Sequence, residues 1–397
     1  MSWPSTTLGD LFDVARGGSP RPIERYVTDD PAGVNWIMIG DASDGSKYIS
    51  KTKKKIIEEG VGRSRTVRPG DFLLTNSMSF GRPYISKIDG CIHDGWLVLA
   101  MKKQNVDQDY FYHLLGSREI YAEFERLAAG ATVKNLNSEL VKGVRVPLPP
   151  LPEQRRIADI LDRAEALRAH RRAALAKLDA LTQAIFIEMF GDPATNPKGW
   201  PEGKLLGDVA EIVSGVTVGR KLGEKRSRVV PYLAVSNVQD RSLDLSVVKR
   251  IEATEEEIAR FRLERDDLLL TEGGDADKLG RGTLWNGELE ECIHQNHVFR
   301  VRLDDAGVDP LFLNWLVGSQ RGKRYFLRSA KQTTGIASIN MTQLRGFPLF
   351  MPPMDLQASF KRRVLGVEKL MSSHRSSLAR LDDLFASLQD RAFRGEL

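Results

Sequence analysis

The sequence predicts an α/β protein with two repeated mixed α/β domains, separated by two long helices that form an antiparallel coiled-coil spacer with pseudo-twofold symmetry. Three observations lead to this fold class. Sequence segments recur about 200 residues apart, a proline-led segment with helical periodicity follows each copy, and short β-rich runs alternate with helical segments in both copies. Such alternation along a chain is typical of a mixed α/β fold.

The internal repeat is visible at three places. The paired segments are Thr7–Gly18 with Leu205–Val216, Gly70–Arg82 with Asp266–Arg281, and Cys91–Leu99 with Cys292–Arg300. Both cysteines of the chain occupy one repeated position. We therefore expect one fold to be used twice.

Each copy contains its own strands and helices. The β-rich runs are Val34–Gly40, Asp71–Thr75 and Trp96–Met101 in the first copy, and Val230–Val238, Asp266–Thr271 and His297–Leu303 in the second. Helical segments are expected at Asp109–Gly130 and Asp309–Ala330, where apolar residues recur at steps of three and four.

A proline-led helix follows each copy. Pro149-Pro150 and Gln154 return as Pro352-Pro353 and Gln357, a shift of 203 residues. The same shift aligns apolar positions at helical steps. These positions are Leu161, Ala164, Leu167, Leu175, Leu178, Leu181 and Ile185, matched by Val364, Val367, Leu370, Leu378, Leu381, Leu384 and Leu388. The first helix, from about Pro152 to Phe190, is expected to run roughly 55 Å. Its apolar stripe packs either on its own block or on the other long helix, and the matched stripes favour the second interpretation.

Composition limits the class of protein. A chain of 397 residues has room for two or three domains, and a hydrophobic content of 41% is ordinary for globular protein. The opening residues lack the pattern of a signal peptide, and no apolar run approaches the roughly 18 residues needed to span a bilayer. Two cysteines indicate no disulfide framework and favour a reducing cytoplasm. The net charge of +5 permits nucleic-acid binding without demonstrating it.

The chain lacks the motifs of a catalyst. It contains no phosphate-binding loop and no Asn/Asp-Pro-Pro-aromatic run of the kind that amino-methyltransferases use. Cys292, His294 and His297 invite a metal site, but residues three apart on a strand face opposite sides, so no metal is expected. Gly273–Gly282 carries two aspartates that suggest a magnesium site, yet a glycine-rich, basic loop favours DNA contact over catalysis.

Basic residues gather in Lys47–Arg68 and Arg220–Arg228, and lysine and arginine neutralise DNA phosphates. The alternative for any one of them is a solvated charged loop. The candidate DNA-binding residues are Arg21, Lys53, Lys54, Lys55, Arg65, Ser77, Arg82, Arg220, Lys221, Arg226, Arg228, Lys278 and Arg281.

The chain resembles the specificity (S) subunit of a Type I restriction–modification system over nearly its whole length. Val146–Leu161 and Pro348–Val364 carry the resemblance, together with Val230–Leu245, Leu268–Trp285 and Cys292–Arg302. Its strength lies in the twofold repeat combined with the proline-led helices. The second copy reads Pro-Met-Asp-Leu-Gln where the first reads Pro-Leu-Pro-Glu-Gln, which weakens the motif there.

The resemblance implies a DNA-specificity subunit without catalytic residues. Target-recognition domains at 1–148 and 196–350 would each read half of a split sequence in double-stranded DNA, and helical spacers at 149–195 and 351–397 would set the spacing. Two methyltransferase subunits would bind S-adenosylmethionine, and restriction subunits would use ATP and Mg; this chain would hold no cofactor. The alternatives are the specificity subunit of a related Type II enzyme, a DNA-modifying enzyme that acts alone, and a scaffold without DNA preference.

Overall fold

The computed structural model describes residues 3–43, 45–76, 81–129, 136–223, 225–274, 279–333 and 336–397. These residues form two compact units. Unit 1 consists of residues 1–173 and 374–397, and unit 2 of residues 174–373. Two long helices, α6 (Leu151–Phe190) and α11 (Met354–Arg394), each contribute one part to each unit. No helix in the described part of the chain is long and apolar enough to cross a membrane.

Unit 1 is built on two five-stranded sheets. The first has the order β3 (Val27–Thr28), β6 (Lys54–Ile56), β4 (Val34–Ile37), β10 (Gly90–Ile92), β7 (Arg65–Val67). The second has the order β2 (Phe12–Arg16), β11 (Trp96–Met101), β8 (Phe72–Thr75), β9 (Pro83–Ser86), β5 (Tyr48–Ile49). Strands β1 (Ser5–Thr7) and β12 (Arg145–Pro147) form a separate antiparallel pair. All four residues of β8 and the first four of β11 are buried, as expected for strands covered on both faces.

Helices of unit 1 share the core of the second sheet: α1 (Leu8–Leu11), α3 (Gln108–Leu115), α4 (Arg118–Ala129) and α5 (Ser138–Gly143). Helix α2 (Glu58–Val61) instead packs against the first sheet, where Val61 contacts the cluster of Trp36 and Ile56. The Asp107 side chain caps α3 by accepting from the backbone N–H groups of Asp109 and Tyr110. Phe12 packs edge-on against Phe72 and Phe111, with ring centroids 5.7 and 5.3 Å apart, so strand and helix share one core.

Unit 2 repeats much of this pairing. Its largest sheet has the order β14 (Ala210–Ser214), β23 (Val298–Leu303), β19 (Leu268–Thr271), β21 (Gly282–Leu284), and it matches β2-β11-β8-β9 in pairing order. The other strands are β18 (Lys249–Thr254), β15 (Ser227–Leu233) and β22 (Ile293–His294); β16 (Val238–Gln239) and β17 (Ser242–Leu243); β20 (Gly273–Gly274), β25 (Ile336–Ser338) and β24 (Lys331–Thr333); and β13 (Glu202–Leu205) with β26 (Pro348–Phe350). The helices are α7 (Glu255–Phe261), α8 (Pro310–Val317), α9 (Gln320–Ser329) and α10 (Met341–Arg345).

One glycine in each unit explains part of the repeat. A Cβ at Gly17 would lie 2.1 Å from the carbonyl oxygen of His93, and a Cβ at Gly215 would lie 1.9 Å from that of His294. No side chain fits at such a distance, so only glycine allows the end of β2 or β14 to pass the repeated Cys-Ile-His segment.

A buried glutamine fastens the start of each long helix. The Gln154 side chain accepts from the Asp107 N–H at 2.8 Å and donates to the carbonyls of Asn105 and Pro149 at 3.0 and 2.9 Å. Gln357 makes the corresponding three bonds, with the Asp309 N–H and the carbonyls of Gly307 and Pro352. Both glutamines are fully buried, so each helix begins at a set position on its block.

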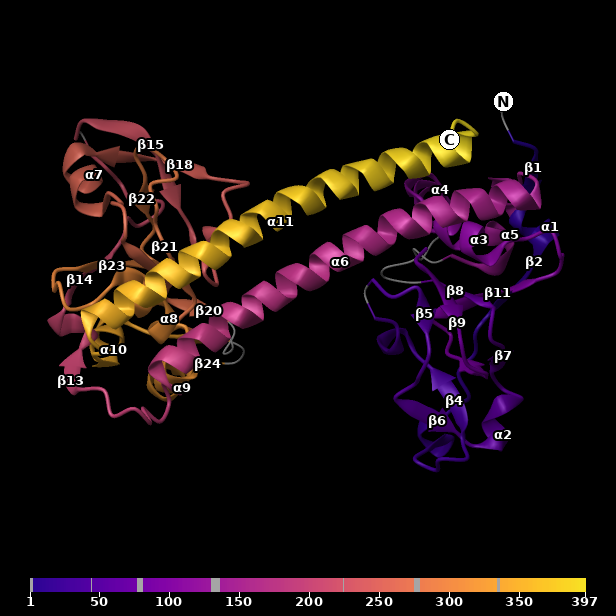
Figure 1. Ribbon diagram of the computed structural model, residues 1–397, viewed down its shortest axis with the longest axis horizontal. Helices are drawn as coiled ribbons and strands as arrows, with labels where there is room; N and C mark the ends of the chain where they lie inside the picture. The colour runs from indigo at the N-terminus through magenta and orange to yellow at the C-terminus, as the bar shows by residue number, and fades with distance from the viewer. Residues whose placement is uncertain are drawn as a thin grey trace. The chain divides into compact units, whose positions relative to one another are not determined.

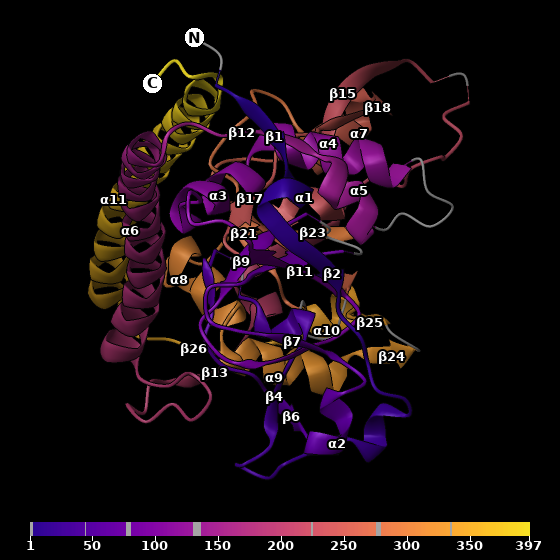
Figure 2. The ribbon, with the colours of Figure 1, turned by 90° about the vertical axis from the view of Figure 1, so that its right-hand side faces the viewer.

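The long helices pack both on a block and on each other within each unit (Figure 1, Figure 2). In unit 1, Ile157 and Leu161 of α6 join the core beneath α3, while Arg168 Nε lies 2.6 Å from Asp382 Oδ1 of α11. In unit 2, the Phe360 ring of α11 packs edge-on against Phe186 of α6 at 5.4 Å. Both modes of packing that the periodicity left open therefore occur inside the units.

The apolar stripes of the long helices are buried at some positions and exposed at others. Leu161 and Val364 are buried, but Leu167 and Leu370 are each 54% exposed. Leu181 and Leu384 are 45% and 49% exposed. Helical periodicity places all of these residues on related faces, but only neighbouring side chains decide which of them is covered.

Candidate nucleic-acid interface

An open cleft in unit 1 gathers two of the predicted DNA-binding residues. Its volume is about 450 Å³, and it lies beside strands β4, β6 and β10. The lining residues are Ser19, Arg21, Ile23, Glu24, Val27, Trp36, Met38, Lys54, His93 and Asp94. Arg21 and Lys54 are both exposed, so their positive charges face the cleft. The buried Trp36 side chain forms part of its lining.

Hydrogen bonds and an ion pair hold Asp94 in a defined position in this cleft. The Ser19 hydroxyl donates to Asp94 Oδ1 at 2.8 Å, and Arg21 Nη2 lies 3.5 Å from Oδ2. Asn76 Nδ2 and Arg16 Nε donate to the Asp94 carbonyl at 2.8 and 3.2 Å. Burial alone would raise the pKa of Asp94, but the Ser19 hydroxyl, His93 and Arg21 together hold that pKa below its usual value. The side chain is therefore an anion at neutral pH.

The remaining candidates of the first block lie in several places. Lys53 and Arg65 are exposed, and Arg65 pairs through its backbone with Ile92. Lys55 Nζ donates to the carbonyl of Pro31. Arg82 lines a different cleft of unit 1, and Ser77 lies outside the described residues.

Two candidates of the second block are bound within the protein. Arg220 Nε donates to Glu257 Oε1 at 2.6 Å, and its side chain is only 18% exposed. Arg228 forms ion pairs with Glu255 and Glu291. A guanidinium already held by carboxylates is less available to a phosphate, so the structure favours a stabilising role for these two arginines.

The other second-block candidates differ in exposure. Lys221 and Arg226 are exposed, and Arg281 Nη1 donates to Gln239 Oε1 at 3.1 Å. Lys278 lies outside the described residues.

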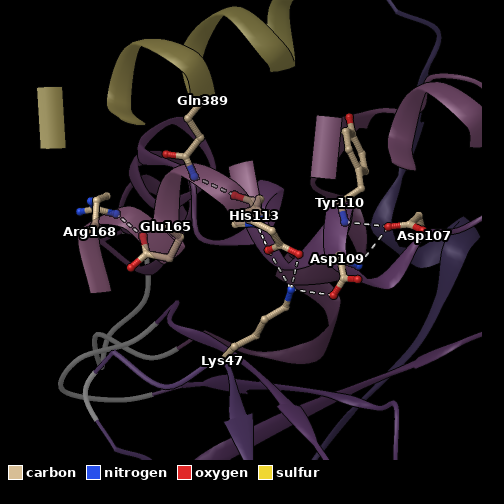
Figure 3. A network of polar contacts seen from close by, with 9 residues as sticks. Lys47, Asp107, Asp109, Tyr110, His113, Glu165, Arg168 and Gln389 are labelled. Atoms are coloured by element: carbon tan, nitrogen blue, oxygen red, sulfur yellow. Dashed lines mark hydrogen bonds and ion pairs between the residues drawn. The ribbon is translucent and has the colours of Figure 1, made fainter. Parts of the chain in front are cut away.

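A polar network in unit 1 joins the first block to both long helices (Figure 3). Lys47 Nζ lies 2.6 Å from Asp109 Oδ1 of α3 and 3.1 Å from Asp162 Oδ1 of α6. His113 Nε2 lies 2.7 Å from the same Asp162 oxygen, and Gln389 of α11 donates to the His113 carbonyl at 3.0 Å. Burial would lower the pKa of Lys47, but the two aspartates raise it above its usual value. The lysine thus stays charged and attaches the block to the helix.

The sequence motif Cys292, His294, His297 does not assemble into a cluster. Cys292 and His294 are buried, whereas the His297 side chain is 56% exposed and lies beside Glu272. Across the residues that the structure describes, no group of three or more His, Cys, Asp or Glu side chains could hold a metal ion. Both cysteines are buried free thiols.

Known specificity subunits are similar to this chain in sequence. Residues 2–177 match the family model described as the Type I restriction modification DNA specificity domain. The chain is 25% identical to the Type I restriction enzyme StySPI specificity subunit of Salmonella potsdam, over 74% of this chain and 66% of that one. It is 24% identical to the EcoKI specificity subunit of Escherichia coli K12, over 72% and 65%.

The chain is thus similar to Type I restriction–modification specificity subunits, and the family model matches its first block and most of its first long helix. The match spans about two thirds of the length of those two relatives. A further relative, the EcoBI specificity subunit of Escherichia coli, is 22% identical over all of this chain and 86% of its own length.

Solved structures share the fold. A chain from a structural study of complex assembly and conformational transition of the type I R-M system gives a TM-score of 0.60 at 18% identity, over 100% of this chain and 98% of that chain. The Type-I restriction-modification system S subunit from M. genitalium gives a TM-score of 0.53 at 16% identity, over 99% and 96%. The mixed α/β architecture is thus that of specificity subunits.

Reasoning from sequence missed the residues that complete the cleft and the network. Ser19, His93 and Asp94 carry no DNA-binding signature by themselves, and Asp94 is negatively charged. Lys47 meets Asp162 across 115 positions of sequence. The one available signal was that position 94, after the repeated Cys-Ile-His segment, is Asp in the first copy and Gln295 in the second.

Proposed function

We propose that this protein is the subunit that gives a Type I restriction–modification complex its DNA specificity. Its two blocks, residues 1–148 and 196–350, act as target-recognition domains, and each reads one half of a split sequence in double-stranded DNA. The chain itself performs no catalysis and works in the cytoplasm. The methyl donor is held by partner methyltransferase subunits, and ATP and Mg serve the restriction subunits.

One observation carries this proposal: two blocks share a scaffold but differ in their exposed polar residues. Gly17 and Gly215 support the same Cys-Ile-His segment, and Gln154 and Gln357 fasten the helices through the same three bonds. The residue after the repeated Cys-Ile-His segment differs, however, because it is Asp94 in the first block and Gln295 in the second. A common frame with two different reading surfaces suits a target made of two different halves.

The long helices supply spacing and docking in this proposal. At 40 and 41 residues, α6 and α11 are each roughly 60 Å long at 1.5 Å per residue. Their matched, half-exposed leucines at 167 and 370 offer apolar surface on corresponding faces, which is typical of interaction sites. We propose that the helices act as an antiparallel coiled-coil spacer (residues 149–195 and 351–397) and that these leucines contact two methyltransferase subunits.

A domain exchange tests the assignment of the half-sites. The first block, up to about Arg145, is replaced by the matching block of a related specificity subunit, and methylated sites are mapped in cells that carry the whole system. We expect one half of the split motif to change and the other half and the spacing to remain. A change in both halves together, or in neither, would contradict the proposal.

Helix insertion tests the spacer in the same assay. Seven residues added in register to each helix preserve the apolar stripe and lengthen each helix by about 10 Å. Base pairs stack at 3.4 Å, so the gap between half-sites should widen by roughly one to three base pairs. An active variant with unaltered spacing would show that the helices do not measure this distance.

A further inference from the structure

We propose that Asp94 recognises the exocyclic amino group of a cytosine in the half-site read by the first block. This inference rests on the proposed function, because it assigns one specificity-determining contact within that block. It starts from an unexpected feature of the cleft, namely a firmly held carboxylate beside Arg21 and Lys54.

The charge of Asp94 excludes a role in binding phosphate. A cleft that only neutralised the DNA backbone would use cations, since phosphates dominate non-specific affinity. Asp94 is ionised at neutral pH and repels a phosphate. A carboxylate accepts hydrogen bonds only, so its partner in this cleft is a hydrogen-bond donor.

The contacts of Asp94 prepare it for such a donor. Oδ1 is occupied by the Ser19 hydroxyl at 2.8 Å, and the peptide carbonyl is held by Asn76 and Arg16. Oδ2 has a longer contact of 3.5 Å to Arg21, and the side chain remains 40% exposed. The carboxylate is therefore fixed through one oxygen and reachable at the other, so little conformational entropy is lost when a donor binds.

The donor pattern of the bases selects cytosine. In the major groove, cytosine presents its N4 amino group as a donor, whereas guanine presents two acceptors and thymine one. Adenine also has an amino group at N6, but its N7 acceptor lies next to that group. The N7 lone pair repels a carboxylate that approaches the amino group. An acceptor-only side chain thus favours cytosine over the other three bases.

The second block places a different side chain at this position. The carbonyls of His93 and His294 lie against matching glycines, so the next residues, Asp94 and Gln295, follow equivalent segments. A glutamine amide both donates and accepts, which suits the paired N6 and N7 groups of adenine. The two blocks thus place a carboxylate and an amide at equivalent positions of the same backbone structure, as expected if they read different half-sites.

The test is an Asp94→Asn variant in the complete complex with its methyltransferase subunits. Asparagine has the same shape and keeps an acceptor for Ser19, but its amide group replaces Oδ2 with a donor. Affinity is measured for duplexes in which each base pair of the first half-site is changed in turn, and methylated sites are mapped in cells. Asp29→Asn is the matched control, because Asp29 is an exposed aspartate of the same block that does not line the cleft.

We expect wild type to discriminate against loss of one cytosine by roughly 5- to 150-fold, the range for a single base contact. Asp94→Asn should remove most of this discrimination at that position alone, and Asp29→Asn should keep it. Three results would overturn the inference: unchanged preference at every position, an equal loss of affinity for all duplexes, or a change confined to the other half-site. If wild type methylates a split motif and Asp94→Asn methylates the same motif, the contact is refuted while the proposed function stands. If wild type shows no split motif, the proposed function itself is refuted.

Discussion

Replacing Gln154 with methionine should loosen the start of α6. Methionine has nearly the same length and fills the buried space, but it makes none of the three hydrogen bonds of the glutamine amide. The Asp107 N–H and the carbonyls of Asn105 and Pro149 would lose this partner inside the protein.

The magnitude follows from counting those bonds. A hydrogen bond contributes a net ~0.5–1.5 kcal/mol to the free energy of unfolding, so three contribute about 1.5–4.5 kcal/mol. Gln357→Met should destabilise by a similar amount, because its three bonds of 2.8, 3.1 and 2.8 Å nearly equal those of Gln154. Gln183→Met is the control: this glutamine is exposed on the same helix α6 and should change stability by less than about 0.5 kcal/mol.

Two measurements check this expectation. Guanidinium unfolding followed by circular dichroism gives the change in midpoint, and hydrogen exchange of the peptide that contains the Asp107 amide gives the local effect. We expect exchange at Asp107 to accelerate by at least about tenfold in Gln154→Met and to be unchanged in Gln357→Met. If Gln154→Met has the same unfolding midpoint and the same hydrogen-exchange protection at Asp107 as wild type, this glutamine does not hold the start of the helix.

Two other predictions concern docking and pH. Leu167→Glu and Leu370→Glu should each weaken binding of methyltransferase subunits by at least about fivefold, since a buried interface anchor contributes more than ~1 kcal/mol; unchanged binding in titrations would contradict the docking surface. Burial lowers the pKa of His294 from 6.5 to about 4, so the unfolded chain binds the proton more readily and stability falls as the pH drops from 6.5 toward 4. From pH 7.5 to 5 this loss should reach about 2 kcal/mol in unfolding experiments. His294→Asn should abolish that contribution, and an unaltered pH dependence would disprove the assignment.

The sequence alone determined the organisation of this protein. Helical periodicity and helix-starting prolines are local properties, so Leu151–Phe190 and Met354–Arg394 could be predicted from residues close together in the chain. The repeated Gly and Cys-Ile-His segments indicated a shared scaffold because the same close backbone approach needs the same residues in each copy. The resemblance to specificity subunits followed from these patterns together.

Only the tertiary structure decided which predicted residues act together. Leu161 and Leu167 share one periodicity, yet one is buried and the other is half exposed, because burial depends on the surface that a neighbouring element supplies. Arg220 and Arg21 are equally basic in sequence, but Glu257 holds the first in a largely buried ion pair, while the second lines an open cleft and is 74% exposed. Charge and hydrogen-bonding capacity belong to a residue type, whereas its free partners depend on groups that only folding brings within about 3 Å.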